Sequence, residues 1–194
     1  MDEVLRIAHV DESGFRLDKD QRLYVVAASI TVSSDASVID QGLRDLLLPG
    51  RRYLHHYDET LDRRLKIAGC LAGLPLTGAL VVVARCDEKA QEDARRRLLS
   101  RLLPTLQHME AVDRVIIESR GGSDKSDRRT ISRLRRSRHL TSDLRADHAP
   151  KAADPLLWVA DFVAGSWVGA QYRDEVEPWR VLDEAHAIEV IQQT

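Results

Sequence analysis

Acidic residues interrupt three apolar segments of this sequence. The stretch HVDESGF, residues 9–15, ends an apolar run in Asp11 and Glu12. Glu118 closes the run VIIE, and Asp161 lies inside LLWVADFVAGSW. An unpaired charge in such surroundings costs several kcal/mol unless a partner compensates it. A shared divalent cation would explain Asp11, Glu118 and Asp161 at once, because hard cations such as Mg²⁺ take oxygen ligands.

The chemistry that such a cluster supports is phosphodiester cleavage. Two divalent ions about 4 Å apart can activate a water and stabilise the leaving oxygen of an in-line displacement. We therefore predict that Asp11, Glu118 and Asp161 are catalytic and that they bind Mg²⁺ or Mn²⁺. Each carboxylate also has a structural explanation that stays open. Asp11 would cap the Ser-Gly turn, Glu118 would pair with Arg120, and Asp161 would form a buried ion pair with an arginine.

Two further acids lie near these three in the sequence. Asp154 is seven residues before Asp161, on the same helical face, and is a candidate fourth metal ligand. It also directly precedes Pro155, where a role as helix N-cap would explain it. Glu12 would point away from Asp11 if the strand continued through it, and we expect Glu12 in the turn instead.

Basic and nucleophilic residues complete the set of candidates. His56, in the loop sequence LHHYDE at 54–59, is a candidate general base, although an exposed loop histidine often has no such role. Lys151 precedes the last junction between a strand and a helix, where it could contact the scissile phosphate. Ser13 has no His/Asp partner pattern, which argues against a serine hydrolase. The sequence SRGGSD lacks the lysine of a phosphate-binding loop.

The charge of the chain is unevenly distributed. The formal net charge is −2, yet residues 119–151 hold ten basic and four acidic side chains, a local charge of +6. In the segment SDRRTISRLRRSRH no acid follows Asp127, so external phosphate is a natural counter-charge. An ordinary solvated helix face is the alternative. We predict nucleic acid, DNA or RNA, as the partner, bound by Arg128, Arg129, Arg133, Arg135 and Arg136 together with Lys151.

The composition is typical of a soluble globular protein. The chain has 194 residues, of which 43% are hydrophobic and 31% charged, and we expect one domain over 1–194. No apolar run approaches the roughly 20 residues of a membrane helix, and the N-terminus has no signal pattern. We therefore expect a cytoplasmic protein with no membrane partner. Cys70 and Cys86 form no metal-ligand spacing, which leaves oxygen or imidazole as the ligands.

Apolar periodicity assigns the candidate residues to secondary-structure elements. Five segments that are rich in β-formers or short and apolar are predicted strands: 4–10, 22–32, 76–86, 113–119 and 141–149. Six segments with helical spacing are predicted helices: 35–50, 58–74, 87–109, 126–137, 154–172 and 179–194. The first two of these helices form a helical insertion at about 36–74, between the second and third strands.

The order of these elements predicts a mixed α/β sheet. The first two strands form a hairpin, and the later strands alternate with helices. Functional side chains in such sheets gather at strand ends. We place Asp11 at the C-terminal end of the first strand and Glu118 at the C-terminal end of the fourth, so the two carboxylates converge if these strands are neighbours.

Four segments carry a resemblance to a known family. HVDESGF, YVVAASITV, VIIESR and DPLLWVADFVAGSWVGA resemble the domain-of-unknown-function 3800 family of RNase H-like proteins, over nearly the whole chain. The resemblance implies an RNase H-like sheet with strands one to three antiparallel and strands four and five parallel. It matches Asp11 to the opening aspartate of the family, Glu118 to the acid that closes the fourth strand, and Ala160-Asp161 to the closing pair. That strand often ends in aspartate in the family, so Glu118 keeps the carboxylate with a longer reach.

The same resemblance implies a metal-dependent nuclease. The alternative is a non-catalytic nucleic-acid-binding or assembly module on the same scaffold. A nuclease requires the carboxylate oxygens of Asp11, Glu118 and Asp161 within about 5 Å of a common centre. A homodimer formed through the tail helix and LLWVADFVAGSWVGA is compatible with either function.

Overall fold

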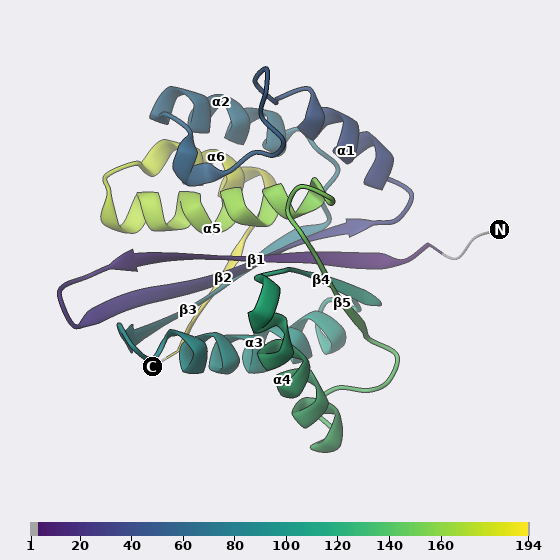
Figure 1. Ribbon diagram of the computed structural model, residues 1–194. Helices are drawn as coiled ribbons and strands as arrows, with labels where there is room; N and C mark the ends of the chain where they lie inside the picture. Colours follow the sequence, from purple (N-terminus) through teal and green to yellow (C-terminus); the bar gives the residue numbers. More distant parts are fainter. Residues whose placement is uncertain (1–3, 194) are drawn as a thin grey trace.

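A six-stranded mixed sheet lies at the centre of the computed structural model, which describes residues 4–193. The strand order is β5-β4-β1-β2-β3-β6, and helices cover both faces (Figure 1). The strands are β1 (Arg6–Arg16), β2 (Gln21–Val32), β3 (Gly78–Asp87), β4 (Arg114–Glu118), β5 (Arg145–Ala149) and β6 (Glu189–Gln193). The helices are α1 (Ala36–Arg44), α2 (Leu61–Ala72), α3 (Gln91–His108), α4 (Asp124–Arg136), α5 (Leu156–Tyr172) and α6 (Val176–His186), with short helical turns η1 (His56–Asp58) and η2 (Gly121–Ser123).

The pairing directions agree with the expected mixed sheet. β1 pairs with β2 and β2 with β3 in antiparallel fashion, whereas β4 pairs with β1 and β5 with β4 in parallel. The parallel pairs require crossovers, which α3 and α4 provide. The expected arrangement of strands one to five is therefore confirmed.

The first strand is longer than its apolar run. β1 continues through DESGFR and pairs with β2 at every position from Arg6 to Arg16. It does so because β2 is long and almost entirely buried, and its backbone groups need partners along their whole length. The prediction that Asp11 ends the first strand is wrong, and so is the prediction of a turn at Ser13-Gly14. The chain turns at 17–20 instead.

The helices form one layer on each face of the sheet. α3 and α4 cover one face, and α1, α2, α5 and α6 cover the other (Figure 1). Along each strand the side chains alternate between the two layers, so that Val26 packs toward α3 while Val25 packs toward α5. Every residue of α5 from 156 to 169 is buried. An acid anywhere in that stretch must find its partners inside the protein.

The end of the chain differs from the expected helix over 179–194. α6 ends at His186, and Ala187 adopts a left-handed conformation with a φ of 46°. The chain then forms β6, which pairs in parallel with the outer edge of β3. Helical spacing in the sequence could not reveal this strand, because the open backbone groups of β3 stabilise it. No helix within residues 4–193 is long and apolar enough to cross a membrane.

Candidate metal centre

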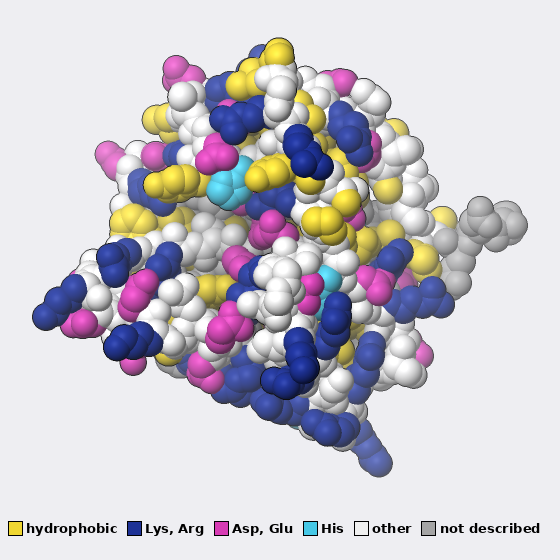
Figure 2. Space-filling view, viewed as in Figure 1, with side chains coloured by type: hydrophobic (Ala, Val, Ile, Leu, Met, Phe, Trp, Pro, Cys, Tyr) yellow, Lys and Arg dark blue, Asp and Glu magenta, His cyan; other side chains and the backbone are white. Residues whose placement is uncertain are grey.

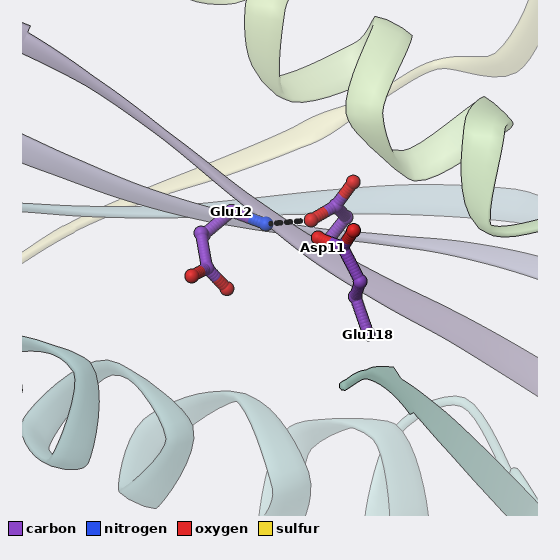
Figure 3. A group of neighbouring side chains, drawn as sticks. All are labelled: Asp11, Glu12 and Glu118. Carbon is purple, nitrogen blue, oxygen red and sulfur yellow. Dashed lines mark hydrogen bonds between the residues drawn. The ribbon is translucent and has the colours of Figure 1, made fainter. Parts of the chain in front are cut away.

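Two of the predicted carboxylates lie side by side where β4 ends. The parallel pairing of β1 with β4 ends at Val10 and Ile117, so Asp11 and Glu118 are the next position on each strand. Val10 and Ile117 face the α3 layer, and the alternation of the pleat turns Asp11 and Glu118 toward α5. Figure 3 shows that their carboxylates approach one another. Asp11 is only 1% exposed.

The third carboxylate comes from α5. Asp161 is buried, and its Oδ2 accepts a hydrogen bond from the backbone N–H of His56 at 2.6 Å. The η1 turn that supplies this donor is itself anchored by Arg64 of α2. The Nε of Arg64 donates to the His56 carbonyl at 2.9 Å, and its Nη1 donates to Glu175 at 2.6 Å. The segment between β2 and β3 therefore fixes the position of Asp161.

Lys151 lies at the centre of the three carboxylates. Its Nζ is 2.7 Å from Asp11 Oδ2, 3.2 Å from Asp161 Oδ1 and 3.6 Å from Glu118 Oε1. The backbone of Lys151 is fixed because its carbonyl accepts a hydrogen bond from the Trp158 indole at 2.8 Å. Only 8% of Lys151 is exposed. The structure thus brings the three predicted carboxylates around one position that holds a cation.

The buried cluster carries more negative than positive charge. Burial, followed by the hydrogen bond and the charge of Asp11, raises the pKa of Glu118 to about 9. Burial also raises the pKa of Asp161, although the Lys151 charge opposes this. Burial alone would lower the pKa of Lys151, but the three carboxylates raise it above its ordinary value. The surroundings therefore favour a protonated Glu118 beside a charged Lys151.

We expect the metal-free protein to lose stability as the pH rises from about 7 toward 9, above the range in which the lowered pKa of His56 acts in the opposite direction. In this window the folded protein keeps a proton on Glu118, whose pKa is raised from 4.5 to about 9, while the unfolded chain has lost it. Rising pH then favours the unfolded state. Urea unfolding in EDTA at several pH values measures the slope. Glu118→Gln should flatten it and the exposed Glu189→Gln should not, and an unchanged slope in Glu118→Gln would contradict the raised pKa.

Glu12 points to the opposite side of β1 from Asp11 (Figure 3). The expectation that it lies in a turn is wrong, because β1 continues through it. One carboxylate oxygen each of Asp11, Glu12 and Glu118 nevertheless lies within 4.8 Å of the others. Burial raises the pKa of Glu12, whereas the ion pair with Arg95 of α3 opposes this. Glu12 is therefore the carboxylate that connects the cluster to the other layer.

Arg95 also connects this strand to the basic helix. It is 1% exposed, and its Nε and Nη2 donate to the Asp127 carboxylate of α4 at 3.0 and 2.9 Å. Burial would raise the pKa of Asp127, but hydrogen bonds from His148 and Arg95 lower it to about 2. This pair was not predicted from the sequence. The available signal was that Arg95 lies in the apolar stripe of α3, three residues before Leu98.

The His55 ring lies next to the carboxylate of Asp161. Its Nε2 lies 3.9 Å from Asp161 Oδ1, and its side chain is 36% exposed. His56, the candidate general base, instead packs its ring edge-on against Phe162, with ring centroids 5.3 Å apart. Burial, followed by the charge of Arg64, lowers the pKa of His56 to about 3. The structure therefore directs the backbone of His56, and not its ring, toward the site.

Gly165 makes this packing of His56 feasible. A Cβ at this position would lie 2.3 Å from His56 Cγ, so we expect Gly165→Ala to displace the ring and the N–H bound to Asp161. The expected loss in the free energy of unfolding is about 1–3 kcal/mol. Gly69→Ala in α2 is the matched control, because no atom lies within 4 Å of its added Cβ and alanine favours a helix. Thermal or urea unfolding compares the stability of the two variants. If Gly165→Ala were as stable as Gly69→Ala, this role of Gly165 would be contradicted.

Asp154 is not brought to the three carboxylates. Its Oδ1 accepts a hydrogen bond from the Leu156 N–H at 3.1 Å, and its Oδ2 lies 3.5 Å from His9 Nε2. Burial would raise the pKa of Asp154, but the His9 contact lowers it. The geometry matches the N-cap explanation of Asp154. A role as fourth metal ligand stays a prediction, with no contact that favours it among the residues described.

The basic residues of α4 project from the molecule. Figure 2 shows Lys and Arg side chains over the part of the surface where Figure 1 places α4, with carboxylates near the centre of the same face. Within residues 4–193 the arginines of α4 form no ion pair, although Arg135 Nη2 donates to the Leu144 carbonyl at 2.9 Å. All are exposed: Arg128, Arg129, Arg133, Arg135 and Arg136. Lys151 lies apart from them, among the carboxylates.

Two cavities flank the carboxylates. One of about 580 Å³ is lined by Tyr53, Lys151 and Glu118 among others. The other, of about 540 Å³, is lined by Asp161 and by residues of β1. His55 and Glu12 line both cavities. The carboxylates therefore lie between two recesses on the same surface.

Solved structures of RNase H type resemble this chain. A variant of Bst-RNase HIII gives a TM-score of 0.51 at 16% identity, over 93% of this chain and 60% of that protein. RNase HII of Archaeoglobus fulgidus, solved in complex with PCNA, gives 0.49 at 14% identity, over 93% and 77%. Ribonuclease H2 of Pyrococcus horikoshii OT3 gives 0.48 at 15% identity, over 87% and 77%. No family model and no curated protein matches the chain.

The likeness to Bst-RNase HIII, together with the strand order, shows an RNase H-like fold. This class of fold is established by the shape of the backbone alone, since the sequence identity is low. Membership of the domain-of-unknown-function 3800 family stays a prediction.

Proposed function

We propose that this protein is a divalent-metal-dependent nuclease that hydrolyses phosphodiester bonds of nucleic acid. One observation carries the proposal. Carboxylates from β1, β4 and α5 converge on a single position, where the Lys151 ammonium is within 3.6 Å of all three. Residues so far apart in the sequence gain nothing from this convergence unless the position serves a cation.

The donor set fits Mg²⁺ or Mn²⁺. Asp11, Glu118 and Asp161 offer hard oxygen ligands at a buried site, and the negative charge around Glu118 exceeds what one monovalent cation balances. Divalent ions bound there would activate a water and stabilise the leaving oxygen. Asp161 is held by the His56 N–H, and Asp11 by the rigid β1–β2 pairing, so the ligands are positioned before a metal arrives.

The surrounding residues have roles that do not involve ligation. His55, the partly exposed ring next to Asp161, would contact a substrate that approaches the cluster from solvent. Lys151 would turn toward a substrate phosphate once a metal replaces its ammonium. The exposed arginines of α4 would bind the nucleic acid backbone, and the buried Arg95 pairs hold that helix to β1.

A combined binding and cleavage experiment tests the proposal. Isothermal titration of the EDTA-treated protein with Mn²⁺ should show saturable binding, with protons released because Glu118 must ionise to bind. Labelled single-stranded and duplex DNA and RNA should then be cleaved in Mg²⁺ and left intact in EDTA. The proposal is overturned if the protein binds no Mn²⁺ and cleaves none of these substrates.

We expect Lys151→Met to bind Mn²⁺ more tightly than wild type. The ammonium and a divalent ion compete for the same three carboxylates, so its removal should lower the dissociation constant by at least about tenfold. Methionine has a similar volume, and near-ultraviolet circular dichroism verifies that the variant folds. Lys66→Met, on the exposed face of α2, is the matched control. Unchanged or weaker Mn²⁺ binding in a folded Lys151→Met would mean that the two cations do not share a position.

The second candidate is a non-catalytic nucleic-acid-binding module. The position of Lys151 favours it, because an internal ammonium can partly neutralise an acidic cluster without any metal. A protein of this kind would bind nucleic acid through α4, bind no Mn²⁺ and unfold when Lys151 is removed. The titration described above separates the two functions.

A further inference from the structure

The cavity that is lined by Asp161 and residues of β1 contains side chains of both charges. It has a volume of about 540 Å³, and its lining includes the acids Glu12 and Asp161 and the arginines Arg16, Arg22 and Arg173. A recess with both charges suits a ligand that presents one group to the acids through a metal and an anionic group to the arginines. A chain of phosphates has this pattern.

Only one of these arginines is without an anionic partner among the residues described. Arg22 Nη1 donates to Glu88 at 3.0 Å, and Arg16 Nε lies 3.8 Å from the same carboxylate. The guanidinium of Arg173 forms neither an ion pair nor a hydrogen bond within residues 4–193. Its five N–H donors therefore lack protein acceptors.

Aromatic rings hold this guanidinium in place. The Arg173 Cζ lies 5.6 Å from the ring centroid of Phe15 and 5.5 Å from that of Tyr57. Phe15 is fixed in turn by stacking on Tyr172, with centroids 5.3 Å apart. Rings bind the faces of a guanidinium and leave its edge, where the donors are, available to a planar or tetrahedral anion.

We propose that Arg173 binds a backbone phosphate of the nucleic acid strand, next to the phosphate that is cleaved. The proposal deepens the proposed nuclease function, since it names the second contact that orients the strand across the carboxylates. An arginine that packs against two rings loses less side-chain entropy on binding than a free one, and its fork matches phosphate oxygens. Arg173 is thus a substrate-positioning residue that lies outside the acidic cluster.

Neutralising one phosphate at a time tests this contact. The probe is a fluorescein-labelled single strand of about 12 nucleotides, within the usual site sizes of single-strand grooves, made as DNA with one methylphosphonate at each position in turn. Affinity is measured in EDTA, and kcat/KM in Mg²⁺. In wild type, a methylphosphonate at one position beside the cleaved bond should lower the affinity and kcat/KM by about tenfold or more. Arg173→Gln should bind and cleave the unmodified strand about tenfold less well than wild type. A methylphosphonate at the sensitive position should then cause no further loss.

Controls separate a direct contact from a structural role. Arg180→Gln, on α6 and paired with Glu177, lies outside the cavity and should keep the wild-type pattern. Arg173→Lys keeps the charge without the planar fork and should recover part of the affinity. If Arg173→Gln weakens all strands equally and the position-specific loss persists, Arg173 only supports the fold around Phe15 and the inference is wrong.

The outcomes also distinguish this inference from the proposed function. Cleavage by wild type without any position that depends on Arg173 would overturn the inference and leave the nuclease standing. Binding with the expected position dependence, while none of the single-stranded or duplex DNA and RNA substrates is cleaved in Mg²⁺, would support the phosphate contact and overturn the nuclease. A wild-type protein that neither binds nor cleaves any of the DNA and RNA substrates would overturn both.

Discussion

Asp11→Asn and Asp161→Asn are each expected to lower Mg²⁺-dependent cleavage by at least about a thousandfold. Each variant removes one carboxylate from the position that holds Lys151, and with it a charge that a divalent ion needs. A thousandfold loss corresponds to about 4 kcal/mol, which is within the several kcal/mol that a bound metal supplies to a transition state. Gel-based cleavage of a labelled strand measures the loss of activity, and Mn²⁺ titration measures the loss of metal affinity.

Stability distinguishes a catalytic carboxylate from one that supports the core. The asparagine in Asp161→Asn can still accept the His56 N–H, and the cluster loses one of its like charges. We therefore expect the free energy of unfolding in EDTA to stay unchanged or to rise slightly. Asp62→Asn, exposed in the first turn of α2, is the matched control. If the free energy of unfolding of either site variant instead falls by several kcal/mol, its carboxylate serves mainly to stabilise the core by pairing with Lys151. The catalytic assignment then fails.

Replacing Arg129, Arg133 and Arg136 together with glutamine should weaken nucleic-acid binding by about two orders of magnitude at about 0.1 M salt. The three residues are exposed, and their spacing along α4 places them on one helical face. The logarithmic salt slope should fall by about 0.7–0.9 for each phosphate that the variant no longer neutralises, because fewer counterions are released. The weakening should not depend on the base sequence of the nucleic acid. Fluorescence anisotropy at several salt concentrations measures both quantities.

The control for this prediction removes arginines from the other layer. Arg44 of α1 and Arg180 of α6 are exposed but already paired with Asp40 and Glu177, so Arg44→Gln with Arg180→Gln should leave the salt slope unchanged. If the α4 variant also keeps the wild-type slope, its arginines do not contact phosphate, and a nuclease would need another surface for its substrate.

Much of the fold was predictable from local pattern. The buried strands β2 and β3 and the helices α3 and α5 have long, strong apolar periods, and their positions agree with the expected segments to within a few residues. The convergence of Asp11 and Glu118 could also be predicted, since parallel neighbours end together. Other boundaries differed more: the helix predicted to reach residue 50 ends at Arg44, and the strand predicted from residue 141 begins at Arg145. The errors at the end of β1 and in β6 belong to strands that depend on the backbone of a partner.

The contacts within the site were less predictable, because side chains from distant segments decide them. The sequence could not show that Lys151 would lie among the carboxylates, since its position depends on the Trp158 hydrogen bond and the start of α5. Nor could it show which histidine of LHHYDE faces Asp161. That choice depends on the space that Gly165 leaves for the His56 ring.

The sequence by itself determined which residues are out of place. An acid inside an apolar segment is recognisable from its neighbours, because the cost of burying a charge does not depend on the fold. Only the tertiary structure decided how each charge is compensated, whether by Lys151, by Arg95 or by the end of a helix. Compensation acts over a few ångströms of space, whereas the partners can be far apart along the chain, as Asp11 and Lys151 are at a separation of 140 residues.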